Sequence, residues 1–313
     1  MIFPPVLTAA LDQMLDGVSR KDLALRAEKM SAAYRTGASS GGIINAADAL
    51  AYAVARMPAT FAACAAVFAR LAEAMPDFSP TSLRDVGAGP GTAAWAAQAQ
   101  WPGIAATILL DRNPALRALA QKLADALRVD AQIIAGDIGM GMPQADLVVA
   151  SYVLAEQPES QAAAIAADLW RDAQTLVLIE PGTPAGFARI RAARAALIDA
   201  GAHVAAPCTH DNVCPMTGDD WCHFSQRLAR SRDHMALKNA HVPFEDERYA
   251  YVAVTREPIE RHVARILAPP LESKPGLTFK LCDADGLRSA FVGTRDKENY
   301  RRVKKRGWGD LFD

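Results

Sequence analysis

The sequence predicts an α/β protein built on a parallel sheet, and three observations lead to this class. Short apolar segments alternate with helical ones between residues 81 and 180, as in sheets whose strands are joined by helical crossovers. A glycine-rich turn follows the first apolar segment, and an acidic residue closes the second. The chain is 51% hydrophobic with a net charge of −1, which excludes a wholly disordered or strongly basic protein.

The first 80 residues are expected to form a helical region. Ser19 and Asp22 have the spacing of a capping box and predict a helix start. A second helical segment is expected from about Ala46 to Met75, with an interruption near Pro58, because proline cannot donate the helical hydrogen bond.

Seven short strands are expected in the central part of the chain. They are Ser82–Val86, Ala106–Leu110, Gln132–Ala135, Asp146–Ala150, Thr175–Ile179, His203–Ala206 and Tyr249–Thr255. Between the second and third, Asn113 and Pro114 have the residue types of a helix N-cap and first helical position. We expect the last strand to return beside the fifth.

Residues 207–240 interrupt the alternation with a cysteine-bearing loop and a basic helical stretch around Arg227–Lys238. In the tail, Leu277–Cys282 alternates with a period of two, and a turn leads to Leu287–Gly293, so a hairpin is expected. The predicted organisation is therefore a helical region over 1–80, an α/β domain over 81–256 with an insertion at 207–240, and a β-hairpin with a basic tail over 257–313.

A ligand site is expected where the strands of the α/β domain end. The glycine loop allows close backbone approach, and carboxylates at the ends of neighbouring strands meet in one crevice. Its spacing, Gly-x-Gly-x-Gly, differs from the dinucleotide-binding pattern. A tight turn with two helix caps is the alternative. The residues expected to line the site are Asp85, Gly87, Ala88, Gly89, Gly91, Asp111, Asp137, Ile138 and Ser151.

This combination resembles the class I methyltransferase fold, a Rossmann-like seven-stranded sheet with a reversed last strand. The resemblance covers about residues 80–256 and implies S-adenosylmethionine at the glycine loop, with Asp111 on the ribose and Asp137 near the adenine. Ala150–Glu156 lacks the Asn/Asp-Pro-Pro-aromatic motif of amino-methylating enzymes. Pro207-Cys208 lies in the wrong part of the fold for a cytosine-methylating nucleophile. No catalytic residue is predicted.

Four cysteines form a candidate metal site: Cys208, Cys214, Cys222 and Cys282. The first three lie in a polar, turn-rich loop, and the fourth points away from the apolar face of its strand. Four thiolates suit either a structural zinc ion or an iron–sulfur cluster, and the spacing leaves the two open. Cys64 lies in an apolar helical segment and is expected to pack in the core.

The chain is similar to a family of small-ribosomal-subunit methyltransferase-like proteins, which are assembly factors of bacteria and mitochondria. The Asp-Trp-Cys-His-Phe run that ends at Phe224 is the most specific match. The matching segments are Leu50–Phe61, Asp85–Thr92, Leu147–Glu156, Pro207–Phe224, Arg227–Lys238, Tyr249–Arg256, Arg265–Cys282 and Trp308–Asp310.

This resemblance implies a 4Fe–4S cluster on the four cysteines, S-adenosylmethionine at the glycine loop, and contact with small-subunit rRNA. Residues 295–306 hold seven basic and two acidic side chains, a composition that suits phosphate contact, and Tyr300 is a candidate to stack on a base. A solvated C-terminal helix is the alternative. A weaker basic patch comprises Arg227, Arg230, Arg232 and Lys238.

Three functions remain open at this point. The first is an rRNA-directed methyltransferase acting in small-subunit assembly, and the second is a non-catalytic assembly factor with the same fold. The third is a small-molecule methyltransferase with a zinc-stapled insertion. No secretory signal is recognisable, and the uncharged stretch Val86–Leu110 is broken by prolines and glycines. We expect a cytoplasmic monomer that does not enter a membrane.

Overall fold

The computed structural model describes residues 3–35 and 40–312. Three helices open the chain: α1 (Pro5–Leu15), α2 (Arg20–Arg35) and α3 (Ala46–Ala74). The hydroxyl of Ser19 accepts the backbone N–H of Asp22 at 3.3 Å, which is the cap that the sequence predicts at the start of α2.

The predicted interruption of the second helical segment is wrong. α3 continues through Pro58 over 29 residues. Proline removes one backbone hydrogen bond, but Met57 and Ala59 on either side are fully buried, so packing stabilises this turn. Among the described residues, α3 is the one helix long and apolar enough to cross a membrane, and 72% of its most apolar stretch is buried inside the protein, as in the core helix of a globular fold.

The large sheet contains every strand expected between residues 81 and 256. Seven of its strands are β1 (Ser82–Val86), β2 (Ala106–Asp111), β3 (Ala131–Ala135), β4 (Ala145–Ser151), β5 (Ala173–Pro181), β6 (His203–Ala206) and β8 (Phe244–Thr255). Their order is β3-β2-β1-β4-β5-β8-β6. β8 runs antiparallel to both β5 and β6, whereas the first five strands pair in parallel.

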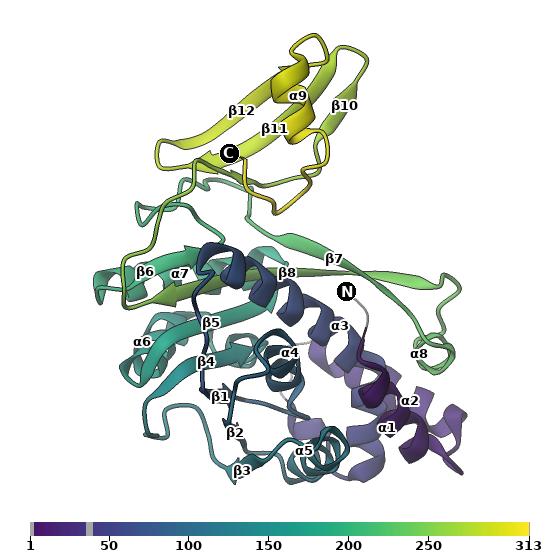
Figure 1. The fold of residues 1–313 in the computed structure, drawn as a ribbon. Coiled ribbons are helices and arrows are strands. Elements are labelled where there is room, and N and C mark those ends of the chain that lie inside the picture. Colours follow the sequence, from purple (N-terminus) through teal and green to yellow (C-terminus); the bar gives the residue numbers. More distant parts are fainter. Residues whose placement is uncertain (1–2, 36–39, 313) are drawn as a thin grey trace.

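This order, with one reversed strand inserted between the fifth and sixth, is that of the class I methyltransferases, so the predicted fold class is confirmed. Helices cover both faces of the sheet (Figure 1). α3, α4 (Thr92–Gln100) and α5 (Pro114–Leu127) pack together on one face, and α6 (Ala162–Arg171) and α7 (Pro184–Asp199) pack together on the other. Three short 3-10 helices lie at Ser40–Gly42, Leu154–Glu156 and Glu159–Gln161.

The predicted helix around Arg227–Lys238 is only partly correct. Residues Phe224–Ala229 form an eighth strand, β7, which pairs antiparallel with the first half of β8. Only Arg232–Leu237 is helical (α8). Pairing with the long strand β8 stabilises an extended conformation at Phe224–Ala229 more than the local sequence pattern stabilises a helix. β7, α8 and the start of β8 form an arm that reaches α2 and α3 (Figure 1).

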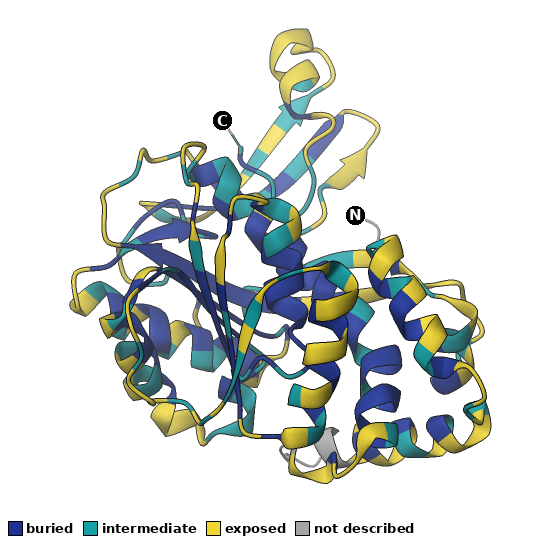
Figure 2. Ribbon diagram, turned by 60° about the horizontal axis from the view of Figure 1, so that its bottom comes forward, coloured by how far each residue is buried: buried dark blue, intermediate teal, exposed yellow. Residues whose placement is uncertain are grey.

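The C-terminal residues form a second, four-stranded sheet. Its strands are β9 (Arg265–Ile266), β10 (Leu271–Ser273), β11 (Gly276–Asp283) and β12 (Gly286–Gly293), followed by α9 (Lys297–Val303). β11 and β12 form the predicted hairpin. Leu277, Phe279 and Leu281 pack with Val303 of α9 in a small separate core. This C-terminal lobe projects from the rest of the protein, which we call the body. The tip of the lobe is exposed, whereas the central strands of the large sheet in the body are buried (Figure 2).

Candidate cofactor sites

The glycine loop joins the end of β1 to the start of α4, and three of its glycines have left-handed backbones. Gly87, Gly89 and Gly91 have φ values of +68°, +55° and +81°, which L-residues with a side chain rarely adopt. A Cβ atom at Gly87 would lie 2.4 Å from Val153, and one at Gly91 would lie 2.5 Å from Trp95. A side chain at either position would clash with Val153 or Trp95, which explains why both residues are glycine.

Gly89 differs from its two neighbours. The atom nearest to a Cβ built on it is Leu116 Cδ1 at 3.9 Å, so the space above Gly89 is open to a ligand. Its backbone N–H donates to Asp111 Oδ2 at 2.8 Å, and those of Gly87 and Ala88 donate to the carbonyl of Leu110. A ligand at this loop would therefore contact the open side of the backbone rather than these three N–H groups.

The three predicted carboxylates all lie at strand ends, but in different surroundings. Asp111 is 7% exposed, and its Oδ1 also accepts the N–H of Asn113 at 2.7 Å. Asp137 is exposed and accepts the N–H of Ile138 at 2.9 Å. Arg112, which lies 4.0 Å from Asp137, was not among the predicted residues. The two aspartates shape the local backbone, and each oxygen retains a lone pair for a ligand.

Asp85 is fully buried where β1 enters the loop. Its Oδ2 accepts the N–H of Ala94 at 3.1 Å, and Oδ1 has no hydrogen-bond partner within the described residues. Burial raises the pKa of Asp85 to about 7, despite the opposing hydrogen bond from Ala94. A buried carboxylate without a counter-charge favours a cationic neighbour.

The segment after β4 carries polar groups that the sequence did not single out. Tyr152, just after Ser151, has a φ of +62°, and its hydroxyl donates to Glu247 Oε1 at 2.9 Å. Arg56 of α3 lies 3.6 Å from the same oxygen. Ser151, which was among the predicted site residues, is half-buried at the end of β4. No local pattern marks Tyr152, Arg56 and Glu247 as a group, because three separate segments bring them together.

The four predicted metal-ligating cysteines line a single hollow of about 520 Å³ between α7, the loop after β6, and the C-terminal sheet. Phe187, Ile190, Met216 and Leu267 supply much of the rest of its wall. Cys282 lies on the face of β11 opposite Leu281, which packs in the small core. In the described part of the chain, no three Cys, His, Asp or Glu side chains lie close enough to hold a single metal ion.

The thiols affect one another across this hollow. Burial raises the pKa of Cys222 well above its usual value, and the other three cysteines raise it further. Burial, with Cys208 and Cys214, raises the pKa of Cys282 to about 12. Without a bound cation Cys222 and Cys282 are thiols at neutral pH. Cys64 lies apart from the hollow, in the main hydrophobic core.

Arg191, Arg194 and Arg265 also line the hollow, and His210 lies beside it. Arg265 is buried and donates to the carbonyls of Pro207 and Gly309 at 2.8 and 2.9 Å, which ties the cysteine loop to the C-terminus. Arg194 of α7 donates to the carbonyl of His210 at 2.8 Å. The Nε2 atom of His210 lies 3.6 Å from the sulfur of Cys282.

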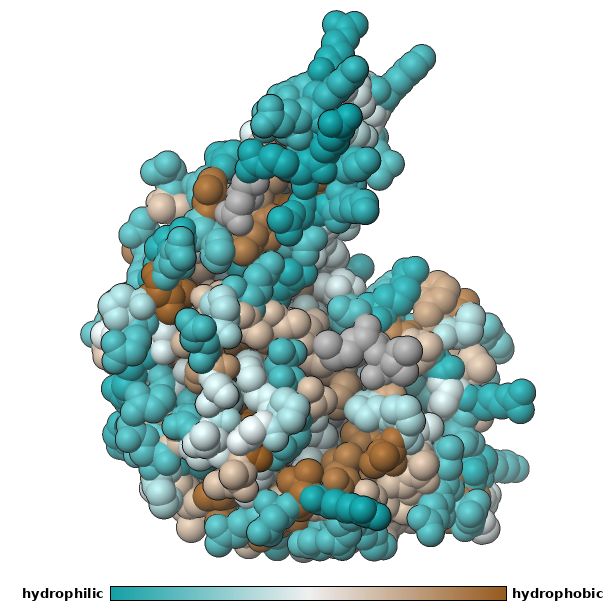
Figure 3. Space-filling model, in the orientation of Figure 1, coloured by the Kyte–Doolittle hydropathy of each residue, from teal (hydrophilic) through white to brown (hydrophobic). Residues whose placement is uncertain are grey.

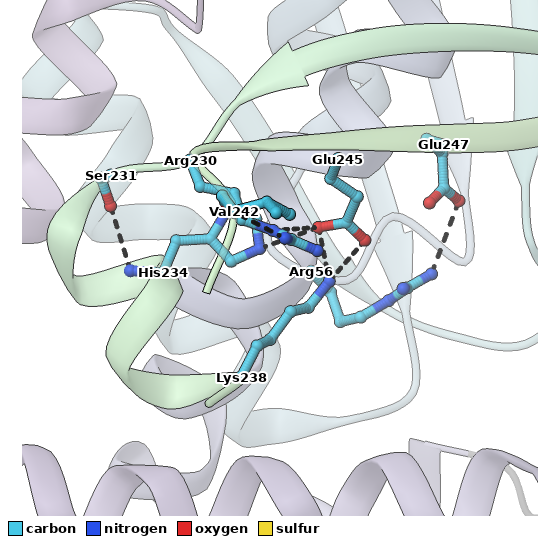
Figure 4. A network of polar contacts seen from close by, with 8 residues as sticks. All are labelled: Arg56, Arg230, Ser231, His234, Lys238, Val242, Glu245 and Glu247. Atoms are coloured by element: carbon cyan, nitrogen blue, oxygen red, sulfur yellow. Dashed lines mark hydrogen bonds and ion pairs between the residues drawn. The ribbon is translucent and has the colours of Figure 1, made fainter. Parts of the chain in front are cut away.

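The two predicted basic regions differ in their pairing. In the arm, Arg227 pairs with Asp246, and Arg230 and Lys238 pair with Glu245; Figure 4 shows the contacts of Glu245 and the nearby pair of Arg56 with Glu247. Two carboxylates therefore neutralise part of the positive charge of this patch, whereas Arg232, its fourth predicted member, is exposed.

The basic side chains of residues 295–306 are all exposed, and no described carboxylate forms an ion pair with them. The tip of the lobe that carries them is strongly hydrophilic (Figure 3). Tyr300 is half-buried and packs against the core of the small sheet, so the structure does not favour it as a freely stacking ring. The tail therefore presents unpaired positive charge in solution.

The family model described as "Mitochondrial small ribosomal subunit Rsm22" matches residues 46–313. The chain belongs to the Rsm22 family. It is similar to the human "Ribosome assembly protein METTL17, mitochondrial", with 29% identity over 297 residues that cover 84% of this chain and 62% of the relative. It is also similar to the Schizosaccharomyces pombe "Rsm22-cox11 tandem protein 2, mitochondrial", with 25% identity, covering 94% of this chain and 46% of the relative. The chain thus spans about half to two thirds of these relatives.

Solved structures of two methyltransferases resemble this chain in fold alone. Magnesium protoporphyrin IX methyltransferase from Synechocystis is 16% identical with a TM-score of 0.44, covering 64% of this chain and 84% of that one. Mitomycin 7-O-methyltransferase is 16% identical with a TM-score of 0.41, covering 82% and 74%.

The expectation of a cytoplasmic protein is wrong. The family description and the human and fission-yeast relatives all carry mitochondrial names. The expectation depended on secretory-signal patterns alone, and these do not distinguish the cytoplasm from mitochondria.

Proposed function

We propose that this chain is an S-adenosylmethionine-binding, iron–sulfur, methyltransferase-like protein that binds small-subunit rRNA during ribosome assembly. The convergence of three cysteines of one loop and the distant Cys282 on one hollow carries the proposal. Membership of the Rsm22 family supports the ribosomal part.

The hollow fits a multi-iron cluster better than a zinc ion. Zinc binds sulfur at roughly 2.3 Å, so its four thiolates must lie roughly 4 Å from one another. The described side chains include no such group, yet all four thiols face the same space. A 4Fe–4S cluster takes one thiolate at each of four separated irons. Cys208, Cys214, Cys222 and Cys282 would hold it, and it would tie the C-terminal lobe to the body.

Anaerobic reconstitution with iron and sulfide tests this part of the proposal. We expect a brown protein with about four irons and four sulfides per chain. The matched control is reconstitution with zinc alone. A colourless protein that binds one zinc and no sulfide would reject the cluster.

The glycine-loop edge fits S-adenosylmethionine. Gly89 leaves open space for the ligand, and each Asp111 oxygen accepts one backbone N–H, which leaves a lone pair on each for ribose hydroxyls. The unpaired carboxylate of Asp85 suits the cationic ligand electrostatically. When bound, the ligand supplies an electrophilic methyl group. Isothermal titration with S-adenosylmethionine tests this, with ATP as the control that shares the adenosine but is an anion.

The exposed basic residues of the tail support binding of rRNA, because they are free to neutralise phosphates. The arm is a weaker candidate, since its own carboxylates already pair with Arg227, Arg230 and Lys238. Gel-shift titration of the protein with small-subunit rRNA fragments tests the contact, with a protein lacking residues 295–306 as the comparison.

The polar side chains at the ends of β4 and β5, Tyr152 and Glu180, favour a scaffold role over rRNA methylation. The hydroxyl of Tyr152 is engaged by Glu247, and Glu180 Oε1 accepts the N–H of Leu154 at 2.8 Å. Burial raises the pKa of Glu180 to about 8, and this side chain is fully buried, so it is not placed to contact a substrate. Mapping methylated nucleotides of small-subunit rRNA with and without the gene separates the roles. A site that disappears with the gene, and returns with wild type but not a Gly89→Val variant, would establish methylation.

A further inference from the structure

We propose that Arg194 is the internal counter-charge of the iron–sulfur cluster and raises its reduction potential. This inference rests on the proposed function, because it requires a cluster on the four cysteines. It concerns a residue outside the cysteine set that lines the same hollow.

Arg194 reaches the hollow from the face of α7 that also presents Ile190 and Phe187. It is 5% exposed. One of its terminal nitrogens donates to the carbonyl of His210, whereas its Nε–H is buried without a hydrogen-bond partner in the described structure. A guanidinium has five N–H donors, so this side chain retains donor capacity beside the thiols.

The charge of Arg194 also lacks a carboxylate partner. Three arginines are buried among the described residues, and the other two lie near acids: Arg84 is 3.9 Å from Asp172, and Arg265 is 3.5 Å from Glu73. No described carboxylate lies within ion-pair distance of Arg194. Because a buried, unpaired charge is costly, the fold is expected to place an anion beside it.

The cysteines are the anion source that the hollow offers. The positive charge of Arg194 acts to lower the pKa of Cys282 and, more than Arg191 does, that of Cys214, against the dominant effect of burial. A 4Fe–4S centre with four thiolates carries a net negative charge, and taking up one electron makes it more negative. A neighbouring cation and N–H donor stabilise the reduced form more than the oxidised form, which raises the potential.

The test is a redox titration of anaerobically reconstituted protein, followed by visible absorbance and electron paramagnetic resonance. Arg194→Met removes the charge and the donors but keeps much of the side-chain volume. At the wild-type midpoint potential, we expect the ratio of reduced to oxidised cluster to fall at least tenfold in this variant, which is about 59 mV for one electron. Arg194→Lys retains the charge, so the ratio of reduced to oxidised cluster should fall less in this variant.

Arg191→Met is the matched control. Arg191 lies on the same helix and borders the same hollow, but its side chain is exposed and it stacks over Phe187. Solvent screens its charge, so we expect less than a twofold change in the ratio. If the midpoint potential shifts as much in Arg191→Met as in Arg194→Met, the specific role of Arg194 is overturned.

The outcomes separate this inference from the proposed function. If wild-type protein takes up no iron and sulfide, both the proposed iron–sulfur function and this inference are rejected. A normal cluster in wild type, with an unchanged midpoint in Arg194→Met, would overturn the inference alone. If Arg194→Met fails to assemble a cluster, assembly in Arg194→Lys supports the counter-charge. Equal loss in both variants would assign Arg194 to holding the His210 loop and would overturn the inference.

Discussion

At the glycine loop, neighbouring strand ends supply the polar groups, and most of these are already hydrogen-bonded within the fold. The cysteine hollow instead collects thiols from a loop and from β11, more than fifty residues further along the chain, and its wall is largely apolar. Asp111 holds two backbone N–H groups without any ligand. The four thiols line one hollow, with raised pKa values at Cys214, Cys222 and Cys282.

This difference indicates which site depends on its ligand. The glycine loop is shaped by its own hydrogen bonds and packing, so its fold should persist without S-adenosylmethionine. The hollow lies between the body and the C-terminal lobe, and metal binding at such a site contributes directly to folding. The predictions below test this contrast, from the largest expected effect to the smallest.

The largest effect is expected from single Cys→Ser changes at Cys208, Cys214, Cys222 or Cys282. Each should abolish most cluster binding and make the C-terminal lobe sensitive to protease, because the cluster joins the lobe to the body. Iron and sulfide analysis with limited proteolysis measures both. Cys64→Ser is the control and should keep the cluster. Normal iron content in any of the four variants would remove that cysteine from the site.

A large effect on RNA binding is expected from the tail. Changing Arg301, Arg302, Lys304 and Lys305 to Gln should reduce the salt slope of rRNA affinity by roughly 0.7–0.9 for each phosphate that is no longer neutralised. The matched control is Arg227→Gln, Arg230→Gln and Lys238→Gln in the arm, where the charges are already paired. Filter binding over a range of salt concentrations provides the slopes. If the arm variant changes the slope more than the tail variant, the assignment of the tail is wrong.

A moderate effect is expected at the glycine loop. Gly89→Val should block the ligand and strain the loop, because φ is +55° there. Asp111→Ala should weaken S-adenosylmethionine binding by about 1.5–3 kcal/mol, the value of a hydrogen bond to a charged group. Gly103→Ala is the control, since nothing lies within 4 Å of a Cβ at Gly103. Unchanged calorimetric affinity in both loop variants would exclude this site.

The smallest effect is a pH dependence of stability from Asp85. Its pKa in the folded protein is about 7, raised by burial from an ordinary value of 3.8. The protonated form is therefore favoured by folding, and this contribution to stability is lost as the pH rises from about 4 to about 7. Asp85→Asn keeps an acceptor for Ala94, and it should raise the thermal midpoint by a few degrees at pH 8 but hardly at pH 4. An equal shift at both values would show that titration is not the cause.

Much of the fold followed from local sequence patterns. The strands of the large sheet, the caps at Asn113 and Ser19 and the C-terminal hairpin depend on short-range periodicity and capping, which physical rules capture well. Two local expectations were wrong for tertiary reasons. The burial of Met57 and Ala59 keeps α3 helical through Pro58. Pairing with β8 makes Arg227–Ala229 part of a strand.

By itself, the sequence determined the α/β class, the glycine turn, the acidic strand ends and the four candidate cysteines, because each depends on residue type and local spacing. The tertiary structure decided which groups remain available for a ligand. It paired Arg227, Arg230 and Lys238 of the arm with Asp246 and Glu245 but left the basic residues of the tail unpaired. It also placed Arg194 without a carboxylate beside four thiols, since burial and the distances between charges arise only when distant segments pack together.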